Sequence, residues 1–208
     1  PFFFSGAEGL LEALFTVPVH PRQDVLAILG HPHSLQGGTM NNKVVTTLAR
    51  TFRALNISSV RFNFRGVGAS EGTYDAGIGE AADMIALYQA CRQLYPYQKI
   101  IFAGFSFGSY VAYRAMHYCQ GDLLITIAPP VHHYNYEEFL TEPWLIIQGE
   151  ADEVVPAELV YQFAEKKKLA LPILRFAQTG HFFHGKLLNL KEELTEFLGT
   201  RVNRHESD

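Results

Sequence analysis

Short apolar runs alternate with amphipathic segments along most of the chain, and this alternation limits the possible folds more than any other feature. The runs carry few polar residues, so both faces of the strands that they predict would be buried. Strands of this kind belong to sheets that helices cover on both sides. The predicted strands are 24–30, 59–64, 99–105, 123–128, 144–149 and 172–177.

Helical patterns separate these strands. Alternating strands and helices are typical of a mostly parallel sheet with helices on both faces, so we expect the α/β class. Segments 2–6 and 10–17 predict a hairpin that adds antiparallel strands at one edge. No internal repeat, low-complexity tract or Pro/Gly-rich linker interrupts the pattern, which favours a single domain over 1–208. The predicted helices are 42–55, 77–94, 107–119, 156–168 and 184–198.

Composition and charge exclude several classes of protein. The chain is 48% hydrophobic, which predicts a substantial core rather than disorder. The formal net charge is −4 and the basic residues are scattered apart from Lys166, Lys167 and Lys168, which read as a solvated helix face, so we expect no nucleic-acid partner. The start, PFFFSGAEG, lacks a secretory pattern and no apolar run is long enough to span a membrane; we expect a cytoplasmic protein without a membrane partner.

The two cysteines, Cys91 and Cys119, have no CxxC spacing and are expected to be reduced thiols packed in the protein.

One hydroxyl stands where the strand 99–105 turns into the helix 107–119. The sequence there reads GFSFG, with Ser106 between Gly104 and Gly108. This G-x-S-x-G pattern is typical of a nucleophile elbow, in which glycines let a strained turn close without collision with the neighbouring strand and helix. Ligands gather at the carboxyl ends of parallel strands, which favours a catalytic serine. The alternative is that Ser106 only caps the helix.

A nucleophilic serine needs a base to take its proton and an acid to orient that base. The loop after 144–149 offers three acids. Asp152 is the predicted acid, because it lies past the first bend of the turn. Glu150 and Glu153 remain alternatives and are expected as exposed loop residues.

The loop after the last predicted strand offers two histidines. His181 is the predicted base, since Gly180 before it permits a tight loop. Phe182 and Phe183 after it can exclude water. His184 is the alternative and is expected at the surface.

A developing oxyanion would need two main-chain donors. The N–H of Phe107, at the start of a helix, is one of them. The other would come from the loop HPHSLQGGTMNN that follows 24–30; because Pro32 has no N–H, the candidates begin at His33. His31 and His33 look like metal ligands, but no carboxylate or third histidine stands at ligand spacing, so we expect no metal.

A glycine-rich stretch at 63–79 invites comparison with the dinucleotide-binding fingerprint. The match fails, because Glu71 stands at the third glycine position after Gly66 and Gly68 and no helix begins directly behind it. We therefore expect no nucleotide cofactor. Arg65 and these glycines are expected to form a loop beside the rim of the active site.

Five spaced motifs closely resemble the α/β-hydrolase superfamily: GHPHSLQGGTMNNKVVTTLARTF, VRFNFRGVGASEG, GFSFGSYVA, GEADEVVP and GHFFHG. The chain is most similar to small bacterial serine hydrolases related to dienelactone hydrolases and carboxylesterases, in a compact group without a cap domain. The resemblance implies Ser106 as nucleophile, Asp152 as acid and His181 as base. It also implies Phe107 and His33 as the oxyanion donors. Dienelactone hydrolases commonly use cysteine, and the elbow here holds serine, so that lactone chemistry is not expected.

Many members of the superfamily carry a helical cap that selects the substrate. Here only 129–143 joins two predicted strands, which is too short for a cap, so the resemblance implies a shallow, open site. Two readings of this segment stay open: one wall of the cleft, or a surface loop with aromatic packing. The residues concerned are His132, His133, Tyr134, Tyr136 and Phe139.

These expectations combine into a functional prediction. The chain would cleave an ester or related acyl bond of a small-molecule substrate through an acyl-enzyme, without a cofactor or metal. A peptidase or thioesterase with the same three residues is an alternative within enzymes. A non-catalytic binding protein is the alternative outside them, since a fold does not fix a function. No pattern in the sequence sets the oligomeric state.

Overall fold

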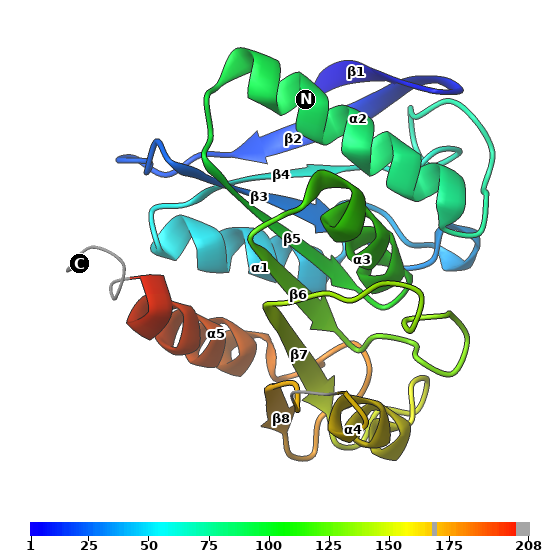
Figure 1. Ribbon diagram of the computed structural model, residues 1–208, viewed down its shortest axis with the longest axis vertical. Helices are drawn as coiled ribbons and strands as arrows, with labels where there is room; N and C mark the ends of the chain where they lie inside the picture. Colours follow the sequence, from blue (N-terminus) through cyan, green and yellow to red (C-terminus); the bar gives the residue numbers. More distant parts are fainter. Residues whose placement is uncertain (168–169, 203–208) are drawn as a thin grey trace.

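The structure, a computed structural model, describes residues 1–167 and 170–202. This part of the chain forms an eight-stranded sheet in the order β1-β2-β4-β3-β5-β6-β7-β8 (Figure 1). The strands are β1 (Phe2–Gly6), β2 (Gly9–Thr16), β3 (Val25–Gly30), β4 (Ser58–Phe62), β5 (Lys99–Phe105), β6 (Leu123–Ile127), β7 (Trp144–Gly149) and β8 (Ile173–Phe176).

The sheet is parallel except at one edge. Strands β3 to β8 pair in parallel, whereas β1 pairs with β2 and β2 with β4 in antiparallel fashion. The predicted α/β class and the predicted hairpin are therefore confirmed. The strand predicted at 59–64 ends earlier than expected, at Phe62. Its last predicted residue leaves the ladder because the Phe64 N–H donates to the His31 ring at 2.9 Å instead of to a neighbouring strand.

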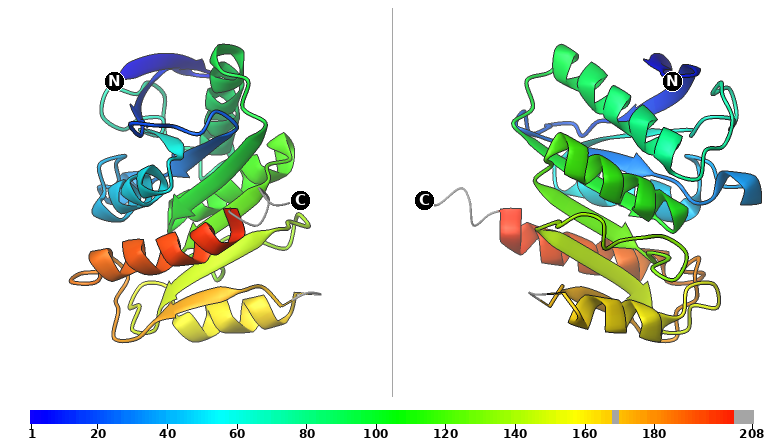
Figure 2. Two further views of the ribbon diagram at one scale, coloured as in Figure 1. Left: turned by 90° about the vertical axis from the view of Figure 1, so that its left-hand side faces the viewer. Right: turned by 45° about the vertical axis from the view of Figure 1, so that its right-hand side comes forward.

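Helices cover both faces of the sheet, as predicted. One hydrophobic cluster lies under α2, α3 and α4 and the other under α1 and α5. Figure 2 shows the two helical layers with the twisted sheet between them. Both faces of the central strands are therefore dry, which explains why these strands read as unbroken apolar runs. The helices are α1 (Lys43–Ala54), α2 (Ile78–Leu94), α3 (Phe107–Cys119), α4 (Ala157–Glu165) and α5 (Leu187–Val202).

Two helix predictions differ from the structure at their ends. The helix expected from residue 184 begins at Leu187, because Phe183 and Gly185 adopt positive φ values of 56° and 72° and form a turn. The helix expected at 156–168 is α4, which ends at Glu165; residue 168 lies outside the described residues. The reading of a solvated lysine face is wrong for Lys167, whose ammonium pairs with a carboxylate and lies 4.6 Å from an aromatic ring centre.

Two further expectations concern the state of the cysteines and the presence of a membrane-spanning segment. Cys91 is buried and Cys119 is partly buried, and both thiols are free. Burial raises the pKa of each to about 12, so both stay protonated at neutral pH. Within the described ranges, no helix combines the length and the hydropathy that a membrane crossing requires.

Helix α3 approaches the sheet closely at three glycines. A Cβ on Gly104 of β5 would overlap the carbonyl oxygen of Gly108 in the first turn of α3. A Cβ on Gly108 would overlap the carbonyl oxygen of Gly30, and one on Gly30 would stand 2.8 Å from the carbonyl oxygen of Gly108. The backbones of β3, β5 and α3 are thus in direct contact, which only glycine allows. The predicted purpose of the two elbow glycines is confirmed.

We expect Gly104→Ala to lower the free energy of unfolding by about 3 kcal/mol, since its methyl group would meet backbone atoms that cannot turn aside. Gly199→Ala in α5 is the matched control. The nearest atom to a Cβ there is 3.9 Å away, so the helix propensity of alanine should raise stability by roughly 0.5–1 kcal/mol. Urea unfolding of both variants measures the difference, and equal effects would contradict the close-contact explanation.

Candidate active site

Ser106 occupies a strained turn at the carboxyl end of β5. Its φ of 54° and ψ of −121° lie in a region that L-residues rarely adopt, at a cost of roughly 1–3 kcal/mol. The Ser106 N–H donates to the carbonyl of Ile127 at 2.8 Å, which holds the turn against the end of β6. The Ser106 hydroxyl makes no capping bond to α3. The cap alternative therefore fails, and the hydroxyl points elsewhere.

The hydroxyl meets the His181 ring. His181 Nε2 lies 3.1 Å from Ser106 Oγ, and His181 Nδ1 lies 2.8 Å from Asp152 Oδ2. The carboxylate can only accept, so Nδ1 carries the proton and Nε2 offers its lone pair to the serine. His181 is 2% exposed, and the rings of Phe105 and Phe182 lie against its ring with centres 4.9 and 5.0 Å away. The side chains of three separate loops thus form one line of hydrogen bonds.

The Asp152 carboxylate is fixed by its own loop. Oδ1 accepts the N–H groups of Val154 and Val155 at 2.8 and 2.7 Å, and Oδ2 accepts from Gln148 Nε2 at 3.3 Å. The side chain is 1% exposed. These donors hold the Oδ2 atom of Asp152 in place against His181.

The rejected candidates lie as expected, with one addition. Glu150 and His184 are exposed, and so is Glu153. The Glu153 carboxylate, however, accepts the main-chain N–H of His181 at 3.2 Å. A Cβ on Gly180 would stand 2.9 Å from that same carboxylate oxygen. The loop that carries Asp152 and Glu153 therefore binds His181 at two points, the ring and the main-chain N–H. Sequence reasoning missed the second contact, although two adjacent acids opposite a Gly-His pair were the available signal.

Phe107 and His33, the predicted oxyanion donors, are neighbours at the start of α3. The N–H of Phe107 and that of His33 donate to no protein acceptor within residues 1–167 and 170–202. Phe107 opens α3, whose amino end carries partial positive charge. His33 precedes the short helix η1 (Ser34–Gln36), and its ring lies 5.0 Å from the Phe107 ring. The side chains of the two predicted donor residues are therefore in contact.

His31 is a structural residue. It is fully buried, its Nδ1 donates to the carbonyl of Pro32 at 2.6 Å, and its Nε2 accepts the N–H of Phe64 at 2.9 Å. Both ring nitrogens are therefore occupied and neither is available to a metal. In the described part of the chain, no three His, Cys, Asp or Glu side chains gather in a way that could hold a metal ion. Burial lowers the pKa of His31 to about 4.

In the connection between β6 and β7, some of the residues lie at the cleft and others form aromatic packing away from it. Tyr134 stacks on Tyr110 and lies 5.9 Å from the Phe107 ring, at the edge of the site. His132 is exposed at the surface. Partial desolvation and the neighbouring His133 lower the pKa of His132, and the nearby Asp152 carboxylate acts in the opposite direction. The other two aromatic residues pack away from the site: Tyr136 is buried beside Trp144, and Phe139 stacks on His117.

Two surface hollows lie far from this chemistry. Their volumes are about 380 and 240 Å³, and both border Glu142, just before β7. The amino ends of parallel strands face the opposite edge of the sheet from Ser106, which follows the carboxyl end of β5. Neither hollow is therefore part of the serine site.

The sheet order, the glycine-lined elbow and the three loops that converge on it define an α/β-hydrolase. No protein-family model matches the sequence. The structure is similar to that of an α/β serine hydrolase without a lid from Xanthomonas campestris, with a TM-score of 0.90 and 40% identity over 94% of this chain and 91% of that one. A second similar structure is an α/β serine hydrolase homologue from Coxiella burnetii, with a TM-score of 0.91 and 42% identity over 95% of this chain and 96% of that one.

An uncharacterized protein from Rickettsia prowazekii is 32% identical over an alignment that covers 95% of this chain and 88% of that protein. The chain belongs to the α/β serine hydrolases that lack a lid. The resemblance inferred from the five sequence motifs is confirmed. Membership of this family supports a hydrolase.

Protonation of His31 should make stability depend on pH. Its folded pKa of about 4 lies below the ordinary value of 6.5, so its contribution is complete above pH 6.5 and is lost as the pH falls toward 4. We expect the wild type to lose about 3 kcal/mol more than His31→Gln between pH 6.5 and pH 4. Glutamine does not titrate and still offers an acceptor for the Phe64 N–H. Urea unfolding across this range tests the difference, and parallel curves would contradict it.

Proposed function

We propose that the protein is a serine hydrolase that cleaves an ester or related acyl bond through Ser106, His181 and Asp152. The observation that carries the proposal is the line of hydrogen bonds from Asp152 through His181 to the Ser106 hydroxyl. The three residues lie in chain order serine, acid, histidine, as in α/β-hydrolases, and each follows its own strand. The 3.1 Å distance is suitable for proton transfer from Ser106 Oγ to His181 Nε2, and at 2.8 Å the Asp152 carboxylate can hold the imidazole through Nδ1.

In the proposed reaction, Ser106 Oγ attacks the substrate carbonyl while His181 Nε2 takes its proton. Asp152 keeps the proton of the imidazole on Nδ1 and stabilises the imidazolium that forms. The N–H groups of Phe107 and His33 donate to the tetrahedral oxyanion. His181 then protonates the leaving group, an acyl-Ser106 ester remains, and a water molecule repeats the attack to release the acid. This chemistry requires no metal or cofactor.

The strain at Ser106 favours an enzyme over a binding protein. A serine with φ of 54° is costly, and a side chain that only contacted a ligand would not need this conformation. Strain of this kind persists where the surroundings enforce it, and here the contacts of three glycines enforce it. The turn presents the hydroxyl to the histidine, which is what a nucleophile needs and what a mere contact residue does not.

Labelling with a fluorophosphonate probe tests the nucleophile. We expect one adduct, on Ser106, and none in Ser106→Ala, as read by mass spectrometry of the labelled peptide. His181→Asn should lower kcat by roughly 10⁴-fold because the base is lost. His184→Asn is the matched control, since His184 is exposed and three residues away, and its kcat should change by less than about twofold. Labelling at another residue, or undiminished labelling of Ser106→Ala, would refute the proposal.

The connection between β6 and β7 supports a proposal about the substrate. It is fixed to α3 rather than built into a cap: the Tyr113 hydroxyl donates to the Phe139 carbonyl at 3.0 Å and accepts its N–H at 2.7 Å. Arg114 also pairs with Glu138 at 2.9 Å. We infer a shallow acyl site that takes small-molecule substrates with short acyl groups.

A series of p-nitrophenyl esters of rising acyl length measures this preference. We expect kcat/KM to be no higher for longer chains than for acetate and butyrate, because a shallow site cannot bury the added methylenes. Each methylene that stays in water forgoes about 0.8 kcal/mol of binding free energy. A steady rise in kcat/KM toward long or bulky acyl groups would contradict the shallow site while leaving the nucleophile untouched.

A further inference from the structure

A tyrosine from outside the serine loops reaches the proposed oxyanion loop. Tyr74 Oη lies 3.1 Å from His33 Nε2, and the two ring centres are 4.9 Å apart. His33 Nδ1 accepts the N–H of Leu35 at 3.2 Å, so the neutral ring carries its proton on Nε2 and donates it to Tyr74 Oη. Burial lowers the pKa of His33, which favours this neutral form. Tyr74 therefore ties the His33 ring to a different segment of the chain.

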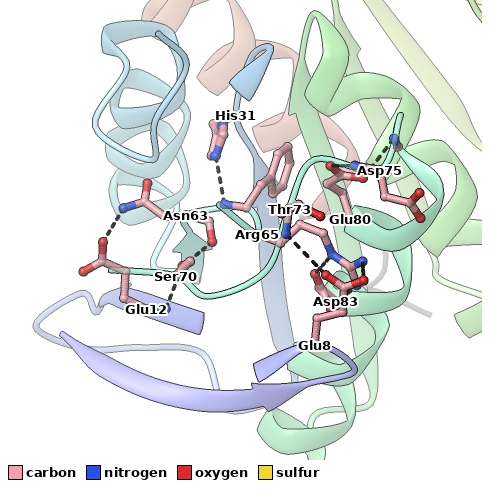
Figure 3. A network of polar contacts seen from close by, with 12 residues as sticks. Glu8, Glu12, His31, Asn63, Arg65, Ser70, Thr73, Asp75, Glu80 and Asp83 are labelled. Carbon is pink, nitrogen blue, oxygen red and sulfur yellow. Dashed lines mark hydrogen bonds and ion pairs between the residues drawn. The ribbon is translucent and has the colours of Figure 1, made fainter. Parts of the chain in front are cut away.

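The loop that carries Tyr74 is held at both ends, as Figure 3 shows. At its start, the buried Arg65 guanidinium donates two hydrogen bonds, 2.7 and 3.0 Å long, to the buried Asp83 carboxylate on α2. At its end, the fully buried Glu80 carboxylate accepts the N–H groups of Asp75 and Gly77, both at 2.9 Å. Buried ionic contacts of this type are costly unless fully bonded, and they fix geometry.

Hydrogen bonds also hold the immediate neighbours of the tyrosine. The Thr73 N–H donates to the Glu8 carboxylate at 3.3 Å, on one side of Tyr74, and Asp75 is held by Glu80 on the other. The same loop meets the segment after β3 a second time, where the Phe64 N–H donates to His31. The loop from β4 to α2 and the proposed oxyanion loop are therefore joined at two histidines.

Tyr74 contacts both residues whose N–H groups are the proposed oxyanion donors. It bonds His33 through its hydroxyl, and its ring lies 5.7 Å from the ring of Phe107. The His33 carbonyl already accepts the N–H groups of Gln36 and Gly38, at 3.1 and 3.0 Å. The carbonyl thus fixes the C-terminal side of the His33 backbone, and the ring bond to Tyr74 adds a restraint from another element.

We propose that Tyr74 is a positioning residue for the oxyanion hole, acting through the His33 ring to hold the His33 N–H toward Ser106. This rests on the proposed function, since it concerns the same site. A donor that stabilises charge in the transition state must be held in place before the reaction begins. Loosening it raises the barrier of the chemical step and leaves ground-state binding nearly unchanged.

Tyr74→Phe tests the proposal, because it keeps the ring and removes only the hydroxyl. Losing an oxyanion donor altogether costs about 10²–10³-fold in kcat, so misplacing one should cost about tenfold, with KM changed by less than about twofold. The rate of fluorophosphonate labelling of Ser106 should fall by a similar factor, roughly tenfold. Tyr88→Phe is the matched control: the Tyr88 hydroxyl accepts from Arg92 on the exposed side of α2, and its loss should leave both rates unchanged.

A double-mutant cycle tests the route through His33. His33→Asn keeps a side-chain acceptor for the Leu35 N–H, as asparagine is a good cap, but is too short to replace the ring nitrogen that meets Tyr74. We expect Tyr74→Phe to lower kcat in the wild type and to have no further effect in His33→Asn. If Tyr74→Phe fails to fold, His33→Asn alone tests the proposal, since it removes the His33 partner of the same hydrogen bond.

The outcomes separate this inference from the proposed function. Wild-type labelling at Ser106 together with an unchanged kcat in Tyr74→Phe overturns the inference alone. A fall in kcat of equal size in both His33 backgrounds, or an effect on KM only, overturns the route through His33. Absence of labelling at Ser106 in the wild type overturns the proposed function itself. Thermal unfolding of each variant shows that the changes in kcat are not losses of folded protein.

Discussion

The direct contact of the backbones of β3, β5 and α3 is the constraint on which the rest of the site depends. Gly30, Gly104 and Gly108 bring the start of α3 against the sheet so closely that any side chain there would overlap a carbonyl group. The chain must therefore leave β5 through a sharp turn, and Ser106 takes the positive φ that this turn requires. The strain at Ser106 follows from packing, and packing is what keeps the hydroxyl directed away from the helix.

Parallel pairing converts this local turn into a site. Because β3, β5, β7 and β8 run the same way, the loops after them end at one edge of the sheet, where α3 begins. Asp152 and Glu153 come from one loop and hold the ring and the backbone of His181 from another. Each partner is held by further contacts. The Asp152 carboxylate accepts two N–H groups of its own loop, the Ser106 N–H donates to the end of β6, and the His181 N–H donates to Glu153. The line of hydrogen bonds therefore needs little rearrangement to form.

The sequence was sufficient to predict residues whose side chains meet at strand ends, and insufficient where the contact is made by backbone. Ser106, Asp152 and His181 were predictable because their residue types follow from the chemistry of a nucleophile, an acid and a base, and their chain order is the one that accompanies the nucleophile elbow. Glu153 was read as an exposed loop residue, since its partner is a main-chain N–H that any residue at 181 would offer. The sequence leaves Tyr136 open between a wall of the cleft and a surface loop with aromatic packing. The side chain packs beside Trp144 and is buried, and the depth of that burial could not be predicted because the size of the aromatic cluster is a property of the packed chain.

The role proposed for Tyr74 follows from the absence of a cap in this family. In an enzyme with a closing lid, binding of substrate can complete the site and exclude water as the lid shuts. Here the connection between β6 and β7 is bonded to α3 through Tyr113 and Arg114, so it is already in place before substrate arrives. A site that does not close must have its donors set in advance. The loop from β4 to α2, anchored by Arg65 and Glu80, gives the oxyanion loop a fixed neighbour that performs this task without any moving part.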